Sequence, residues 1–250
     1  MKVLLTCPPM ISRLSDLTYD AKRLTFVVPD FVQTMTEDAL VDLLCSGEFD
    51  AWIIGDDPAT RRVFEAGRHT LKRVVKWGAG IDNVDTDALR DLDIPFTNTP
   101  GLFGESVSDV AVGMLLALTR SLPAIDRGVR SGQWPKPCCV EIASKRVCIV
   151  GLGNVGQAVA RKLNAFRCDI WASDPAFVNT KHGATRGVMI VPNVRVAPLE
   201  EASAGATVLI ITYRRLRRAM GVPPWEKRTG ASSAPVGLGL SRRSRRPRRR

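Results

Sequence analysis

The sequence contains no apolar run that approaches the length of a membrane-spanning helix. Its first residues, 1–9, hold an apolar stretch too short for a secretory signal and more typical of a first core strand. We therefore expect a cytoplasmic protein with no membrane partner. At 250 residues, the chain is long enough to bury a sizeable core and to divide into two domains.

The six cysteines lack the spacing of metal ligands and imply no disulfide framework. The adjacent pair Cys138 and Cys139, in a proline-rich loop, could be redox-active or bind a metal with help from other residues. Free cysteines are more often small apolar fillers, and this is the interpretation we favour. No metal site is predicted.

Acidic residues are almost missing from residues 214–250, which contain twelve arginines, one lysine and a single glutamate. The segment carries a net charge of +12, whereas residues 1–213 carry −1. No periodicity in the segment would bury a face, so we expect a disordered tail. Such a tail could bind polyanions, but it has one aromatic residue, Trp225, and no repeated motif, so nucleic acid is not the expected partner.

A glycine-rich turn, Gly151-Leu152-Gly153-Asn154-Val155-Gly156, is the most informative motif. Residues 146–150 before it form an apolar, β-branched run typical of a buried parallel strand. Apolar residues after it recur at helical spacing. A strand, a glycine turn and a helix in this order are typical of a dinucleotide-binding site.

Each glycine of the turn has its own physical reason. Gly151 permits a tight turn, Gly153 lets the backbone approach a pyrophosphate, and Gly156 lets the helix pack closely on the strand. The N–H groups at the helix N-terminus would then face the phosphates.

An acidic residue follows at the expected distance. Residues 169–173 form a second strand-like run that ends at Asp174, roughly twenty residues after the turn, where a carboxylate can hold the adenosine ribose. A carboxylate there would repel the extra phosphate of NADP, so NAD is the predicted cofactor. The alternative is a glycine-rich turn that binds nothing.

Strand-like and helical patterns also alternate before the turn. We expect strands at 3–5, 24–28, 51–54 and 74–77, with helices at 37–45 and 60–65, which together indicate a small parallel α/β domain ending near Asn98. Residues 106–109 have the form of a capping box, so a long helix should start there. Beyond Asp174 we expect strands at 194–196 and 207–212 and a short helix at 199–202.

Three landmarks in this order resemble the D-isomer specific 2-hydroxyacid dehydrogenases over about residues 1–213. They are Lys76-Trp77-Gly78-Ala79-Gly80-Ile81-Asp82-Asn83-Val84-Asp85, then Asn98-Thr99-Pro100-Gly101, then the glycine turn with Ser173-Asp174-Pro175.

The resemblance implies an α/β protein with a flavodoxin-like substrate domain (1–98), an incomplete Rossmann NAD-binding domain (99–213) and the disordered arginine-rich tail (214–250). Two further strands of the Rossmann sheet are expected after residue 212, and the tail supplies neither. The family transfers a hydride between NAD(H) and a small 2-hydroxy or 2-keto acid, and its members are usually homodimers.

The resemblance also assigns residues. The backbone around Gly78, Ala79 and Gly80 would hold the substrate carboxylate. Asn154 and Val155 would contact the pyrophosphate, and Asp174 the ribose.

The family's catalytic Arg, Glu and His lie after the strand at 207–212, and no histidine follows that strand here. His69 and His182 are the only two histidines, at positions that the family does not use for catalysis. No catalytic residue is therefore assigned, and we expect an impaired or inactive enzyme; the alternative is a non-catalytic NAD-binding protein.

The character of the sequence changes abruptly between Tyr213 and Arg214, within a family motif. One hypothesis is translation of the downstream coding region in a wrong frame. It can be checked by reading the other two frames.

Overall fold

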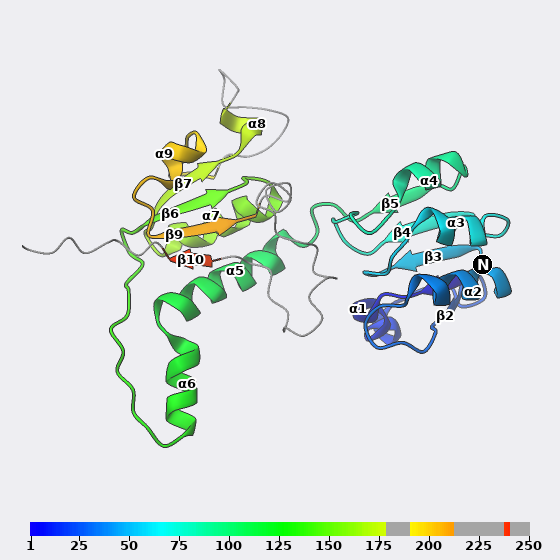
Figure 1. Cartoon of the computed structure of the whole chain (residues 1–250), viewed down its shortest axis with the longest axis horizontal. Helices are drawn as coiled ribbons and strands as arrows, with labels where there is room; N and C mark the ends of the chain where they lie inside the picture. The colour runs from blue at the N-terminus through cyan, green and yellow to red at the C-terminus, as the bar shows by residue number, and fades with distance from the viewer. Residues whose placement is uncertain (179–190, 213–237, 241–250) are drawn as a thin grey trace, which may run out of the picture. The chain divides into compact units, whose positions relative to one another are not determined.

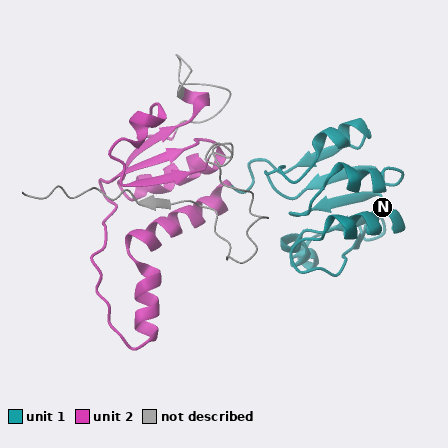
Figure 2. Ribbon diagram, in the orientation of Figure 1, with its two compact units in different colours: residues 1–103 teal, residues 104–250 magenta. Residues whose placement is uncertain are grey.

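The computed structural model describes residues 1–178, 191–212 and 238–240. The chain divides into two compact units, Met1–Phe103 and Gly104–Arg250 (Figure 2). The division falls slightly after the boundary that the sequence suggests near Asn98.

The first unit is built on a parallel five-stranded sheet with the order β2-β1-β3-β4-β5 (Figure 1). This is the flavodoxin-like order, so the predicted fold of the first domain is confirmed. The expected strands are present, and β5 is one that the sequence analysis missed. The bounds are β1 Lys2–Leu5, β2 Thr25–Val27, β3 Ala51–Ile54, β4 Arg73–Lys76 and β5 Phe96–Asn98.

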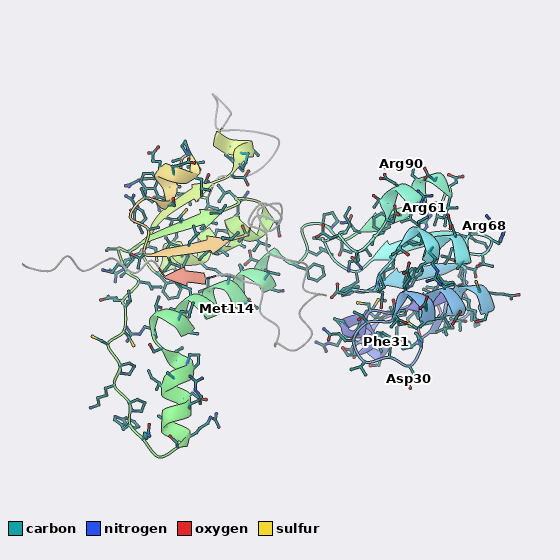
Figure 3. The ribbon with its side chains drawn as sticks, viewed as in Figure 1. Asp30, Phe31, Arg61, Arg68, Arg90 and Met114 are labelled. Atoms are coloured by element: carbon teal, nitrogen blue, oxygen red, sulfur yellow. The ribbon has the colours of Figure 1, made fainter. Side chains whose placement is uncertain are left out.

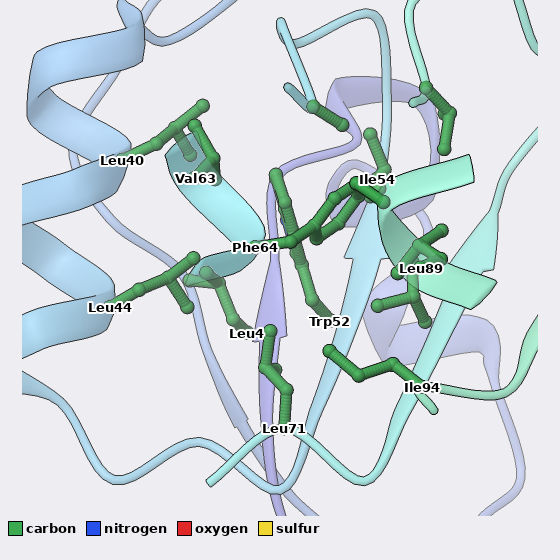
Figure 4. Close-up of a cluster of buried hydrophobic side chains, with 14 of the residues drawn as sticks. Leu4, Leu40, Leu44, Trp52, Ile54, Val63, Phe64, Leu71, Leu89 and Ile94 are labelled. Carbon is green, nitrogen blue, oxygen red and sulfur yellow. The ribbon is translucent and has the colours of Figure 1, made fainter. Parts of the chain in front are cut away.

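Helices and loops supply the rest of the first unit's core. Thr36 caps α2, accepting a hydrogen bond from the Ala39 amide, which fixes where that helix begins. Figure 4 shows apolar side chains of the helices packed with those of the strands, around Trp52 and Phe64. Arg61, labelled with Arg90 in Figure 3, ties α3 to α4 through Asp91. The helices are α1 Pro8–Ile11, the 3-10 helix η1 Leu14–Asp16, α2 Glu37–Ser46, α3 Arg61–Gly67 and α4 Thr86–Asp91.

The second unit contains a sheet with the order β10-β9-β6-β7-β8. Strands β6 to β9 pair in parallel and have the order of the first four strands of a Rossmann sheet. The expected strands are therefore confirmed. Their bounds are β6 Arg146–Val150, β7 Asp169–Ser173, β8 Val194–Val196 and β9 Val208–Ile211.

A short strand, β10 (Leu238–Leu240), pairs antiparallel with β9. The expectation of a disordered tail is thus wrong at these three residues, because the open edge of β9 offers hydrogen-bonding groups to any extended segment. A Rossmann sheet would have a parallel strand in this place. The remainder of the predicted disordered tail lies outside the described residues.

The long helix α5 (Gly104–Thr119) begins two residues before the capping-box motif that was expected to start it. Ser106 is therefore inside the helix, and the hydroxyl of Ser108 donates to the carbonyl oxygen of Glu105 in the same helix. A capping box cannot form there, because the backbone is already helical at Ser106. The other helices of this unit are α6 Leu122–Arg130, α7 Asn154–Ala165, α8 Pro175–Val178 and α9 Leu199–Ser203.

Helix α5 packs along α7, and Lys162 joins the two. Its ammonium lies 2.6 Å from the Ser108 hydroxyl and 2.6 Å from the Asp109 carboxylate. Met114 lies farther along α5 in Figure 3. Among the described helices, none alone has the length and apolarity to cross a membrane. The pair α5 and α6 meets these two criteria only when the helices are taken together, and a 66° bend separates them.

A buried polar network joins β1, β3 and the loop after β3. Asp57 is fully buried, and its carboxylate accepts hydrogen bonds from the Thr6 hydroxyl and from the Met35 amide, the latter at 2.9 Å. The Trp52 indole donates in turn to the Thr6 hydroxyl at 2.9 Å. Burial raises the pKa of Asp57, although the hydrogen bonds it accepts act in the opposite direction.

This raised pKa predicts a pH dependence of stability. The stability that comes from protonating Asp57 is fully present below its ordinary pKa of 3.8 and is lost as the pH rises through the raised value. The side-chain amide of the Asp57→Asn variant does not titrate. We expect the free energy of unfolding of the wild type, minus that of the variant, to fall as the pH rises above 3.8 in urea titrations. A difference that is constant or rises with pH would contradict this.

Candidate cofactor site

The glycine turn lies at the carboxyl end of β6 and leads directly into α7. Gly151 has a φ of +95°, in a region that side chains rarely adopt, so glycine is required there. Its amide donates to the carbonyl oxygen of Ser173 at 2.8 Å, which joins the turn to the end of β7.

The other two glycines differ in their surroundings. A Cβ at Gly156 would lie 2.1 Å from the carbonyl oxygen of Gly151, so helix and turn approach too closely for any side chain. A Cβ at Gly153 would meet nothing within 4 Å. The space over Gly153 is therefore open to a ligand, and the space at Gly156 is filled by the protein itself.

The peptide between Gly151 and Leu152 is held at both ends. The Leu152 amide donates to the Asp174 carboxylate at 2.7 Å, in a buried contact. The Gly151 carbonyl oxygen accepts a hydrogen bond from the Thr212 hydroxyl, also at 2.7 Å. Gln157 fixes the next peptide, between Leu152 and Gly153, because its side-chain amide donates to the Leu152 carbonyl oxygen at 2.9 Å. The turn is thus fixed by side chains that follow β7 and β9, the two strands beside β6, and by a side chain of α7.

The N-terminus of α7 is free of the turn's bonds. Gly153 occupies the N-cap position, and no described side chain caps the helix. The first amides of a helix have no intrahelical acceptor, so those of Asn154 and Val155 are available to an anion. Gly153 and Asn154 are also solvent-exposed. An open approach, free amides and a rigid turn fit the pyrophosphate of a dinucleotide.

Asp174 lies where the sequence placed it, directly after β7, and it is 9% exposed. Besides the Leu152 amide, it accepts the Ala176 amide at 2.9 Å. A carboxylate has about four acceptor positions, so two bonds leave capacity for a ribose hydroxyl.

The three residues proposed for the substrate carboxylate lie in the first unit, after β4. Gly78 has a φ of +142°, and its amide is already bound to the Thr99 hydroxyl at 2.9 Å. The Ala79 carbonyl oxygen accepts from Asn98 at 3.0 Å. The structure therefore brings two of the sequence landmarks together. The amides of Ala79 and Gly80 donate to no acceptor among the described residues, and only these two are open to a carboxylate.

A buried lysine lies beside this loop. The Lys76 side chain is 4% exposed, and its ammonium contacts the Gly55 carbonyl oxygen and, at 3.0 Å, the Asp56 carboxylate. Lys76 thus ties the end of β4 to the loop after β3, while Asn98 and Thr99 hold the start of the loop between β4 and α4.

Sequence reasoning missed Thr212, Gln157 and Thr99. Thr99 belonged to a recognised landmark, but its partner could not be read from the sequence. For Thr212 the available signal was its place at the carboxyl end of a predicted strand, the edge where the glycine turn must lie. Gln157 gave no signal, because a polar residue in a helix is more often solvated.

Of the residues considered for other chemistry, His69 is exposed and its ring accepts a hydrogen bond from Arg68. His182 and Trp225 lie outside the described residues. Cys148 is buried in β6, and burial raises the pKa of its thiol to about 11, in agreement with a packing role. The adjacent cysteines form no disulfide; Cys138 is exposed and Cys139 half-buried, so the expected role as buried apolar fillers is wrong for Cys138.

Comparison with known proteins identifies the second unit. Residues 112–216 match the family model for the NAD-binding domain of D-isomer specific 2-hydroxyacid dehydrogenases. The chain is 35% identical over 119 residues to a hydroxypyruvate reductase of Thermotoga maritima, covering 47% of this chain and 39% of that one. It is 41% identical over 105 residues to a glyoxylate/hydroxypyruvate reductase of Arabidopsis thaliana, covering 40% and 32%. The matches therefore span less than half the length of these relatives.

The fold is shared with solved structures. The apo-structure of D-lactate dehydrogenase from Escherichia coli aligns with a TM-score of 0.68 and 20% identity, over 85% of this chain and 65% of that chain. Such low identity carries information on the fold alone. Residues 112–216 of the chain thus match the NAD-binding domain of the D-isomer specific 2-hydroxyacid dehydrogenases.

Proposed function

We propose that this chain binds NAD(H) at the glycine turn of its second unit. One observation carries the proposal: the N-terminus of α7 has no side-chain cap and lies behind Gly153, over which there is open space. A pyrophosphate placed there would meet backbone amides and the positive end of the helix dipole. The turn is fixed by hydrogen bonds within the protein itself, so little ordering is needed on binding.

Two groups of residues have roles in this proposal, one at the start of α7 and one after β7. The amides of Asn154 and Val155 bind the pyrophosphate, and Asp174 accepts a hydrogen bond from the adenosine ribose. A 2′-phosphate would bring a second negative charge against the Asp174 carboxylate, so NAD is preferred over NADP.

The reaction that we propose for this site is hydride transfer between the nicotinamide and C2 of a small 2-hydroxy or 2-keto acid. The relatives' names, such as hydroxypyruvate reductase, support this substrate class. In this chain the amides of Ala79 and Gly80 would bind the substrate carboxylate. Assembly as a homodimer and a cytoplasmic location stay predictions from the sequence.

Turnover needs a group that donates or accepts the proton at the substrate oxygen. His69 is exposed on the first unit, and no histidine follows β9 in the sequence. We therefore infer a protein that binds the cofactor and transfers hydride poorly. The change of sequence character after Tyr213 supports the wrong-frame hypothesis for the missing residues.

The contrast between two glycines tests the binding site. Gly153→Ala adds a methyl group to open space, and alanine is a poorer N-cap than glycine, so we expect only a small fall in melting temperature. We expect NADH binding to weaken roughly tenfold or more, because the methyl group occupies the path of the pyrophosphate. Gly156→Ala should lower the melting temperature strongly, since the added Cβ would lie 2.1 Å from the Gly151 carbonyl oxygen. Both quantities are measured by NADH fluorescence titration and calorimetry.

Gly113→Ala is the matched control, because a Cβ at this position of α5 also meets nothing within 4 Å. It should leave NADH binding unchanged. The proposal fails if Gly153→Ala binds NADH as tightly as the wild type does, or if the wild type does not bind it.

Catalysis is tested separately with the purified 250-residue chain. General acid–base catalysis typically contributes on the order of a hundred- to ten-thousand-fold in rate, so we expect little or no oxidation of NADH with glyoxylate, hydroxypyruvate or phosphohydroxypyruvate. Rates typical of the family, followed by loss of NADH absorbance, would refute the inference that this chain lacks its proton-transfer group.

A further inference from the structure

The Gly151–Leu152 peptide is fixed by two side chains that come from opposite sides. Its N–H points to Asp174, after β7, and its carbonyl oxygen points to Thr212, after β9, each at a distance of 2.7 Å. Strands β7 and β9 are the two neighbours of β6 in the sheet. The peptide that opens the glycine turn is therefore held between the ends of the flanking strands.

This peptide needs outside support because Gly151 has great conformational freedom. Glycine at a φ of +95° can rotate its peptide plane with little steric resistance. Rotation would break both hydrogen bonds and would move the Gly151 carbonyl oxygen from its close approach to Gly156. The position of α7's first amides depends on that approach.

We propose that Thr212 is a positioning residue for the cofactor pyrophosphate, acting through the Gly151–Leu152 peptide. This inference rests on the proposed function. Thr212 is half-buried, and the shortest hydrogen bond of its hydroxyl is the one to Gly151; the Val150 carbonyl oxygen lies farther away, at 3.3 Å. Its Oγ1 would also lie 3.1 Å from a Cβ at Gly156, so it sits where turn and helix meet.

Asp174 holds the other end of the same peptide, but it cannot serve as the test residue. Its carboxylate also binds the Ala176 amide and is assigned to the ribose. A substitution there changes three interactions. Because Asp174 has both roles, replacing it to let NADP bind would also remove the acceptor of the Leu152 amide.

Thr212→Val removes the hydroxyl and keeps the branched shape, while Thr212→Ser keeps the hydroxyl. We expect Thr212→Val to weaken NADH binding about three- to tenfold and Thr212→Ser to bind within about twofold of the wild type, since one neutral hydrogen bond is lost only in the first. Adenosine has no phosphate, so its affinity should be the same in all variants.

Thr119→Val is the matched control. Thr119 is a buried threonine whose hydroxyl also donates to a carbonyl oxygen, that of Leu115, at 2.8 Å within α5. This variant removes an equivalent bond away from the turn, and its affinity for NADH should equal that of the wild type.

Amide hydrogen exchange in the ligand-free chain gives a readout that does not depend on the cofactor. The Leu152 amide should exchange faster in Thr212→Val and at the wild-type rate in Thr119→Val, because only the first releases the peptide.

The possible results separate the two proposals. Equal NADH affinity in Thr212→Val and the wild type overturns the role of Thr212, and so does a parallel loss of adenosine affinity, which indicates general destabilisation. A wild type that does not bind NADH overturns the proposed function, and Thr212 then positions no cofactor; faster exchange at Leu152 would remain as a property of the turn alone.

Discussion

The close contact between the Gly151 carbonyl oxygen and Gly156 is the constraint on which the rest of the second unit depends. It fixes the start of α7 against the end of β6 and leaves no room for a side chain at Gly156. Helix α7 is also tied to α5 by Lys162, farther along the helix, so it is held at two places along its length. Its amides therefore point in a set direction, which lowers the cost of ordering when an anion binds.

Much of the fold could be predicted from the sequence because it depends on local patterns. The strands at 146–150, 169–173 and 194–196 occur at the expected residues, since a short buried β-branched run has few alternatives. The predicted start of α5, at the capping-box motif, is two residues too late, because the residues before the motif are also helical and sequence-based helix ends are uncertain by one or two residues. Strand β10 could not be foreseen, because its pairing depends on the open edge of β9 and not on its own residues.

For the candidate site, sequence analysis identified the glycines and the carboxylate of the motif. It did not identify the side chains that hold the turn by hydrogen bonds from distant parts of the chain. The three glycines and Asp174 belong to a known spacing. Thr212 is distant from Gly151 in the chain and meets it only because parallel strands end at one edge of the sheet. Contacts of that kind follow from topology, which no local pattern encodes.

The central claim is that the glycine turn of the second unit is a ready-made NAD(H) site. Amide NMR spectra of the isotope-labelled chain, recorded with and without NADH, test it most directly. We predict that the largest shift changes occur at Gly153, Asn154 and Val155, with further changes at Asp174. Spectra that do not change on addition of NADH, or changes confined to residues away from the turn, would contradict the claim.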